Sequence, residues 1–118
     1  MKGTMLIYKV DATAPEIVAF VDAAPTLDDL QKAVEGDIQT VPEFDHIRIN
    51  GERHTAWAIC NEDGKVKEMP VNKLATLLWE QIAANKGLKL RDAKGDFLDV
   101  LVGPVAVLYG DKEFMEEL

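Results

Sequence analysis

The dipeptide Asn50-Gly51 constrains the fold of this chain more than any other local feature. A two-residue type I′ turn needs positive φ at both central positions, and asparagine and glycine adopt such angles most readily. Apolar and β-branched residues flank the dipeptide in the runs 47–49 and 55–59. We therefore expect an antiparallel hairpin here. A second turn at 61–64 would lead into a third short strand at 65–69, completing a three-stranded meander.

Two segments carry helix signals. Thr26 can cap a helix with Asp29 three residues later, which predicts a first helix over 27–35, stopped by Gly36. Asn72 is a natural cap for a second helix that ends near 85–87. The apolar stripe of this second helix, expected to pack across the sheet, consists of Leu74, Leu77, Leu78 and Ile82.

The other apolar runs predict short strands. They lie at 5–10, 16–21, 38–41, 97–102 and 105–109. Gly103-Pro104 predicts a bend between the last two, and 88–96 reads as a loop. Residues 110–118 form an acidic tail that is either a short helical turn or flexible. The fold class we expect is α+β, with a mainly antiparallel sheet of about six to eight short strands and two helices packed on it.

Length and composition indicate one α+β domain over residues 1–118. The chain is 47% hydrophobic and 29% charged, which suits a folded core. The net charge of −8 disfavours direct binding to nucleic acid or to an anionic membrane, and leaves a basic partner open. Because the acids are scattered among lysines, the charge fits solubility better than mimicry of nucleic acid.

No catalytic or metal-binding set stands out. The single Cys60 excludes an internal disulfide and cannot by itself form a zinc site. His54 would lie about 20 Å from Cys60 along an extended strand, too far for proton transfer. Glu62 or Asp99 could act as the base of a hydrolase, but neither has a matched nucleophile. We therefore expect no enzyme activity and no cofactor.

The 61–64 turn and the start of the second helix form the predicted ligand site. A helix N-terminus presents free N–H groups that favour anions, so a phosphate or nucleotide could bind there. The candidate ligand-binding residues are Asn61, Glu62, Lys65, Asn72 and Lys73. A structural reading stays open beside this one, because Asn61 suits a turn and Asn72 suits a helix cap whatever the protein binds.

The two tryptophans are the largest apolar side chains. Trp57 alternates with alanines on its strand, which favours a core position. Trp79 lies one position after Leu78 and off the main stripe of its helix. It is therefore a candidate interface residue, with a place at the core edge as the alternative.

The segment 61–76 also carries a family resemblance. Its Asn-Glu-x-Gly-Lys turn followed by a Pro-x-Asn helix start resembles a family of small domains of unknown function encoded largely by bacteriophages and mobile elements. Further similarity lies in the motifs Gly36-x-Ile38-Gln39-x-Val41-Pro42 and Asp99-Val100-x-x-Gly103-Pro104-Val105. The resemblance implies a phage or mobile-element source, and no assigned chemistry.

Four functions compete on these grounds. The leading hypothesis is a non-enzymatic phage or mobile-element accessory protein in the cytoplasm of a bacterial host cell. It would act by binding, as a counter-defence inhibitor of a host protein or by sequestering a small anionic nucleotide signal. The alternatives are a structural domain that forms a homodimer, an acidic nucleic-acid mimic, and a hydrolase. No apolar run approaches the roughly 18 residues of a membrane span, and no secretory leader is evident.

Overall fold

The computed structural model describes residues 1–118 and has a five-stranded antiparallel sheet, a separate hairpin and three helices. The strand order of the large sheet is β2-β1-β7-β6-β3. Its strands are β1 (Lys2–Tyr8), β2 (Glu16–Val21), β3 (Ile38–Thr40), β6 (Trp57–Asn61) and β7 (Val105–Gly110). The hairpin pairs β4 (His46–Ile49) with β5 (Glu52–Thr55). The helices are α1 (Leu27–Val34), α2 (Lys73–Asn85) and α3 (Lys112–Glu116), so the expected α+β class is confirmed.

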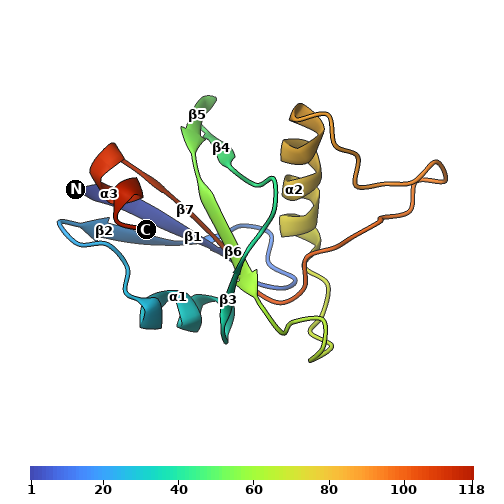
Figure 1. Ribbon diagram of the computed structural model, residues 1–118, viewed down its shortest axis with the longest axis horizontal. Helices are drawn as coiled ribbons and strands as arrows, with labels where there is room; N and C mark the ends of the chain where they lie inside the picture. Colours follow the sequence, from blue (N-terminus) through green and yellow to red (C-terminus); the bar gives the residue numbers. More distant parts are fainter.

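Both faces of the large sheet carry a hydrophobic core. Side chains alternate along a strand, so Val105 and Val107 of β7 pack toward α2, whereas Ala106 and Leu108 pack toward α1 and α3. All four are fully buried. In Figure 1, α2 lies to the right of the sheet, α1 lies below it and α3 lies over its left part. β7 therefore forms the centre of the fold.

The helix caps agree with the sequence. Thr26 and Asp29 form the expected capping box at the start of α1, which ends at Glu35 in the left-handed conformation with φ 62°. The side chain of Asn72 accepts from the Ala75 N–H and caps α2. Leu77 departs from the prediction, since it is 46% exposed. The face of α2 that enters the core consists of Ala75, Thr76, Trp79, Ile82 and Ala83.

The Asn50-Gly51 turn is confirmed, with φ angles of 51° and 81°. The predicted meander is wrong, because β5 and β6 belong to different sheets. The chain leaves the hairpin at Ala56, whose N–H donates to the Asp45 carbonyl at 2.9 Å. Residues 65–68 form hydrogen-bonded turns and 65–69 contain no strand, with the Lys67 N–H donating to the Asp63 carbonyl at 2.9 Å. The neighbours of β6 are β3 and β7.

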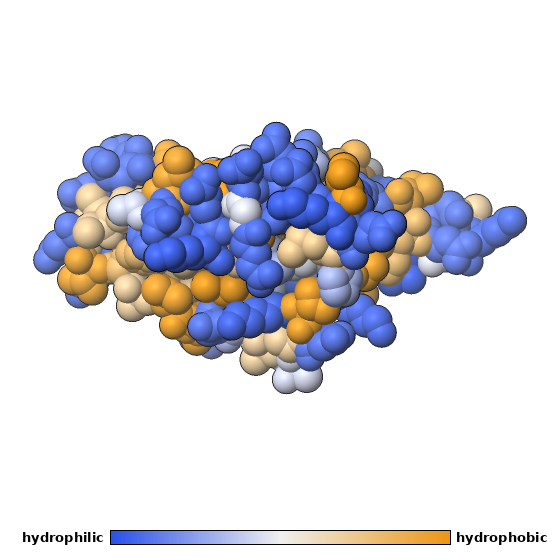
Figure 2. All heavy atoms as spheres, turned by 90° about the horizontal axis from the view of Figure 1, so that it is seen from below, coloured by the Kyte–Doolittle hydropathy of each residue, from blue (hydrophilic) through white to orange (hydrophobic).

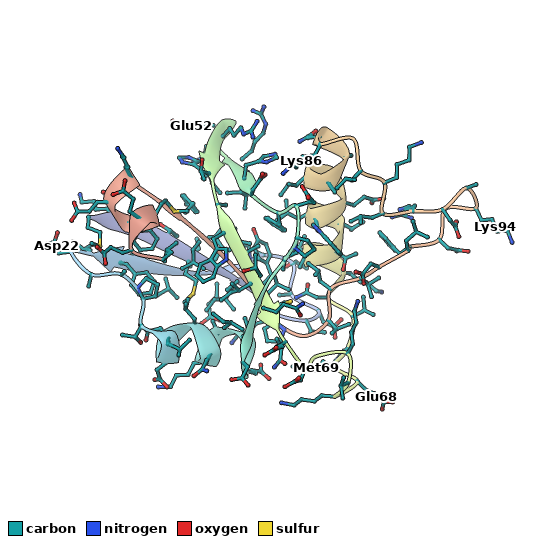
Figure 3. The ribbon with its side chains drawn as sticks, viewed as in Figure 1. Asp22, Glu52, Glu68, Met69, Lys86 and Lys94 are labelled. Atoms are coloured by element: carbon teal, nitrogen blue, oxygen red, sulfur yellow. The ribbon has the colours of Figure 1, made fainter.

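The predicted strand at 97–102 is also absent. That segment has only isolated bridges, from Phe97 to Arg91 and from Val102 to Val71. The expected bend is present at Gly103, where φ is 68°. The loop between α2 and β7 extends from the body of the molecule with Lys94 near its tip (Figure 3), and this narrow end is polar (Figure 2).

Residues 112–116 form α3 rather than a flexible tail. Asp111 caps this helix by accepting from the Phe114 N–H at 2.9 Å. The Phe114 ring is fully buried and packs 6.0 Å from the Phe20 ring, centroid to centroid. None of the three helices is both long and apolar enough to cross a membrane.

Candidate functional site

Asn61, a predicted ligand residue, is buried and its amide is satisfied by the protein itself. Its Nδ2 donates to the carbonyls of Val34 and Glu35, each at 3.1 Å, and its Oδ1 accepts from the Asp63 N–H at 2.8 Å. These bonds tie the end of β6 to the end of α1. The geometry thus supports the structural reading of Asn61.

Asn72 is fully buried and joins three segments. Its Nδ2 donates to the carbonyl of Tyr8 at 2.8 Å and to that of Gly103 at 2.9 Å, while its Oδ1 accepts from Ala75. Its own N–H donates to the Leu101 carbonyl at 2.8 Å. The side chain and N–H of Asn72 are therefore committed to protein groups and offer nothing to an anionic ligand.

Glu62 and Lys65 are brought together at a cleft of about 270 Å³, which also includes Asp99 and Cys60. Lys65 forms an ion pair with Asp99. Two carboxylates face one lysine here, so the local charge does not favour an anionic ligand. Lys73 does not join this cleft, because it borders a separate hollow beside residues 11–13.

The cleft offers weak nucleophilic chemistry. Burial raises the pKa of the Cys60 thiol, with Asp99 adding to the effect and Lys65 opposing it. A raised pKa reduces the thiolate fraction at neutral pH, and the thiolate is the reactive form. No histidine lines the cleft to compensate.

Trp79 belongs to the core, which corrects its prediction as an interface residue. It is 4% exposed, and its indole N–H donates to the Pro42 carbonyl at 2.8 Å. Periodicity alone did not identify this position, because α2 carries its own apolar residues around most of its circumference. The wide ring buries the most surface when the helix turns it toward the sheet.

The two histidines sit at the hairpin. His46 is buried, and its Nδ1 lies 2.9 Å from Asp45 Oδ1. Lys86, at the end of α2 nearest the hairpin (Figure 3), bridges Asp45 Oδ2 at 2.6 Å and Glu43 at 2.8 Å. The hydrogen bond from Lys86, followed by that from His46, lowers the pKa of Asp45 to about 2.

This lowered pKa predicts an acid-labile contact between the hairpin and α2. The pKa of Asp45 is depressed on folding, so its contribution is complete above about pH 4 and is lost as the pH falls through about 2. The side chain is about half exposed, so we expect less than about 1 kcal/mol. Urea unfolding should show Asp45→Asn less stable than wild type at pH 6, with most of this difference lost at pH 2. A stability difference between Asp45→Asn and wild type that persists at low pH would contradict this assignment. The control is Asp28→Asn, which removes the carboxylate of the exposed pair between Asp28 and Lys32 on α1.

Strand β2 is the surface feature that sequence reasoning missed. It lies at one edge of the sheet and pairs only with β1. Ile17 and Val21 are 71% and 61% exposed, and Ala19 between them is exposed too. Within the strand only Glu16, at its start, is charged. Alternating apolar side chains thus lie open on one face of an edge strand.

The free backbone groups of β2 belong to these same residues. The Asp22 N–H donates to the Met1 carbonyl at 2.8 Å, so Asp22 and Met1 form a hydrogen-bonded pair of the β1–β2 ladder. Hydrogen-bonded pairs alternate in an antiparallel ladder, so Val18 and Phe20 bond to β1. Ile17, Ala19 and Val21 therefore direct their N–H and C=O groups outward.

A shallow hollow borders each face of β2. The first, of about 360 Å³, lies between α1 and an apolar floor formed by Met5, Ile7, Val18 and Phe20. The second, of about 470 Å³, lies over Ala19 and Val21 and is bounded by His54 and Tyr109, whose ring centroids are 5.0 Å apart. Figure 2, which views the molecule from the α1 side, shows several apolar patches separated by polar side chains.

Comparison with known proteins supplies a family and no chemistry. No curated protein and no solved structure matches this chain. One family model, described as "Domain of unknown function (DUF3846)", matches residues 1–117. This agrees with the resemblance to a small domain of unknown function, whereas the phage origin stays a prediction. The chain belongs to the DUF3846 family of domains of unknown function.

Proposed function

We propose that this protein acts by binding another protein, and that an extended segment of the partner adds to the open edge of β2. One observation carries the proposal: Ile17, Ala19 and Val21 combine exposed side chains with outward-facing backbone groups. Natural proteins usually protect such edges with charges, prolines, bulges or short strands. This edge is six residues long and carries none of those devices between its ends. Strand addition supplies main-chain hydrogen bonds and buries alternate side chains.

The partner that we propose is a host protein in the bacterial cytoplasm, in keeping with a non-enzymatic accessory protein of a phage or mobile element. Sequestration of an anionic nucleotide has less support. The cleft beside Glu62 holds two carboxylates and a lysine already paired with Asp99. The amides of Asn61 and Asn72 are occupied by internal hydrogen bonds.

Proline at position 19 tests this docking strand. The Ala19 N–H points away from β1, so Ala19→Pro removes no bond of the internal ladder and blocks an added strand. We expect a tagged wild-type protein to retain a host protein from lysate and Ala19→Pro to retain at least about tenfold less, equivalent to about 1.4 kcal/mol. Amide exchange in the purified complex should be slowed at Ile17, Ala19 and Val21.

Ala19→Thr is the matched control, since it keeps the N–H and favours a strand. It should retain the partner as wild type does. Equal retention by Ala19→Pro, or amide protection confined to other elements, would refute the docking strand. Far-ultraviolet circular dichroism verifies that both variants are folded.

A further inference from the structure

We infer that the segment bound by β2 is apolar in its centre and basic at both ends, and that it is not a second copy of this chain. This inference rests on the proposed function and specifies the partner at the same edge. It follows from the charges that flank β2, from the register of self-pairing and from the apolar side chains along the strand.

Acidic side chains flank the apolar part of the edge. Glu16 begins β2 and Asp22 follows it, and both side chains are exposed. The cationic groups that pair with these two acids lie on the β1 side of the strand. Lys9 Nζ lies 3.0 Å from Glu16, and the Met1 amino group lies 3.8 Å from Asp22. Because β2 is an edge strand, no basic residue of the sheet lies beyond it. An incoming strand therefore meets a carboxylate at each end, on a chain with net charge −8.

Pairing between two copies is disfavoured by these same acids. Two β2 strands related by a two-fold axis use all their outward-facing groups only when Ala19 lies opposite Ala19, and Ile17 opposite Val21. This register also places Glu16 of one copy opposite Asp22 of the other, at both ends. Like charges directly opposite each other destabilise a strand pair. A segment with lysine or arginine at those two positions replaces both repulsions with attractions.

The centre of the segment is specified by the apolar side chains of β2. On the face toward α1, the added strand lies beside Val18 and Phe20, which are partly buried. On the opposite face it lies beside the exposed Ile17 and Val21. Apolar and aromatic cross-strand pairs stabilise an antiparallel sheet, so apolar residues are favoured on both faces of the centre of the segment.

Two labelled peptides test the inference. The first has the sequence Lys-Val-Phe-Thr-Val-Val-Lys, and the second has the same centre with glutamate at both ends. In fluorescence anisotropy we expect the lysine peptide to bind about tenfold more tightly, because exposed ion pairs replace like-charge contacts at both ends. The preference should shrink at high salt, which screens exposed charges.

The double variant Glu16→Gln/Asp22→Asn should lose most of this preference. Asparagine tolerates the positive φ of 59° at position 22. The control variant Glu52→Gln/Glu68→Gln changes the net charge equally, at positions far from Asp22 (Figure 3), and should keep the preference.

The outcomes separate the inference from the proposed function. Equal binding of both peptides, abolished by Ala19→Pro, would leave the docking strand in place and overturn the basic ends. Binding unaffected by Ala19→Pro would remove the docking strand itself. Failure of the lysine peptide to bind, while the host partner still protects Ala19, would also overturn the inference. Sedimentation should give a monomer, and a dimer lost in Ala19→Pro but kept in Ala19→Thr would show that a second copy is the occupant.

Discussion

Replacing Trp79 with alanine is expected to lower the free energy of unfolding by about 4 kcal/mol, the range typical of a large buried aromatic residue. The ring is 4% exposed and packs in the core between α2 and the sheet. Its indole N–H also donates to the Pro42 carbonyl, which would lose that partner. Urea denaturation followed by circular dichroism measures the change.

Leu77→Ala on the same helix is the matched comparison. Leu77 belongs to the stripe that periodicity assigns to the core, yet it is 46% exposed. We expect a loss below about 1 kcal/mol, as for a surface position. A result in which Leu77→Ala is the more damaging change would contradict the orientation of α2. A Trp79→Ala protein that is as stable as wild type but loses its partner would restore Trp79 as an interface residue.

Asn72→Ala should cost about 3 kcal/mol, of which the helix cap contributes about 1 kcal/mol. The rest comes from the carbonyls of Tyr8 and Gly103, which lose a buried donor at about 1 kcal/mol or more each. The change would loosen the contacts among β1, α2 and the bend before β7. Thermal and urea unfolding measure it.

Two further variants make the Asn72 test specific. Asn72→Ser keeps a side-chain oxygen for the cap and loses the two donor bonds, so it should fall between wild type and alanine. Asn85→Ala, at the exposed end of α2, should change stability by less than about 0.5 kcal/mol. If Asn72→Ala unfolded like wild type and only ligand binding suffered, the asparagine would be a binding residue after all.

Elements governed by neighbouring residues could be predicted from the sequence. The Asn50-Gly51 turn depends on backbone angles that these two residues supply themselves. The cap of α1 depends on Thr26 and Asp29, which are three residues apart. The bounds of β2 and the start of α2 follow from equally local signals.

Pairing across the chain could not be predicted in the same way. The run 55–59 is continuous in hydrophobicity, yet Ala56 divides it between two sheets. β6 pairs with β7, almost 50 residues later, because that contact fills the core on both faces. The run 97–102 is apolar enough for a strand but finds no neighbouring strand over its length.

The same distinction between local and long-range contacts applies to the candidate site. The turn role of Asn61 and the cap role of Asn72 follow from local signals, but their partners Val34 and Tyr8 lie 27 and 64 residues away. The edge position of β2 depends on the order of the whole sheet, which no local pattern specifies. The alternation of Ile17, Ala19 and Val21 was the available signal, and it is shared by strands that are covered.

The central position of β7 also has a consequence for biosynthesis. The β1–β2 pair and the β3–β6 pair contact each other in the sheet only through β7. Residues 105–110 leave the ribosome after all the other strands, so the two pairs cannot join into one sheet before then. Until β7 is added, β1 lacks its second neighbour in the sheet. The sheet of this protein is therefore completed only when its final strand is inserted.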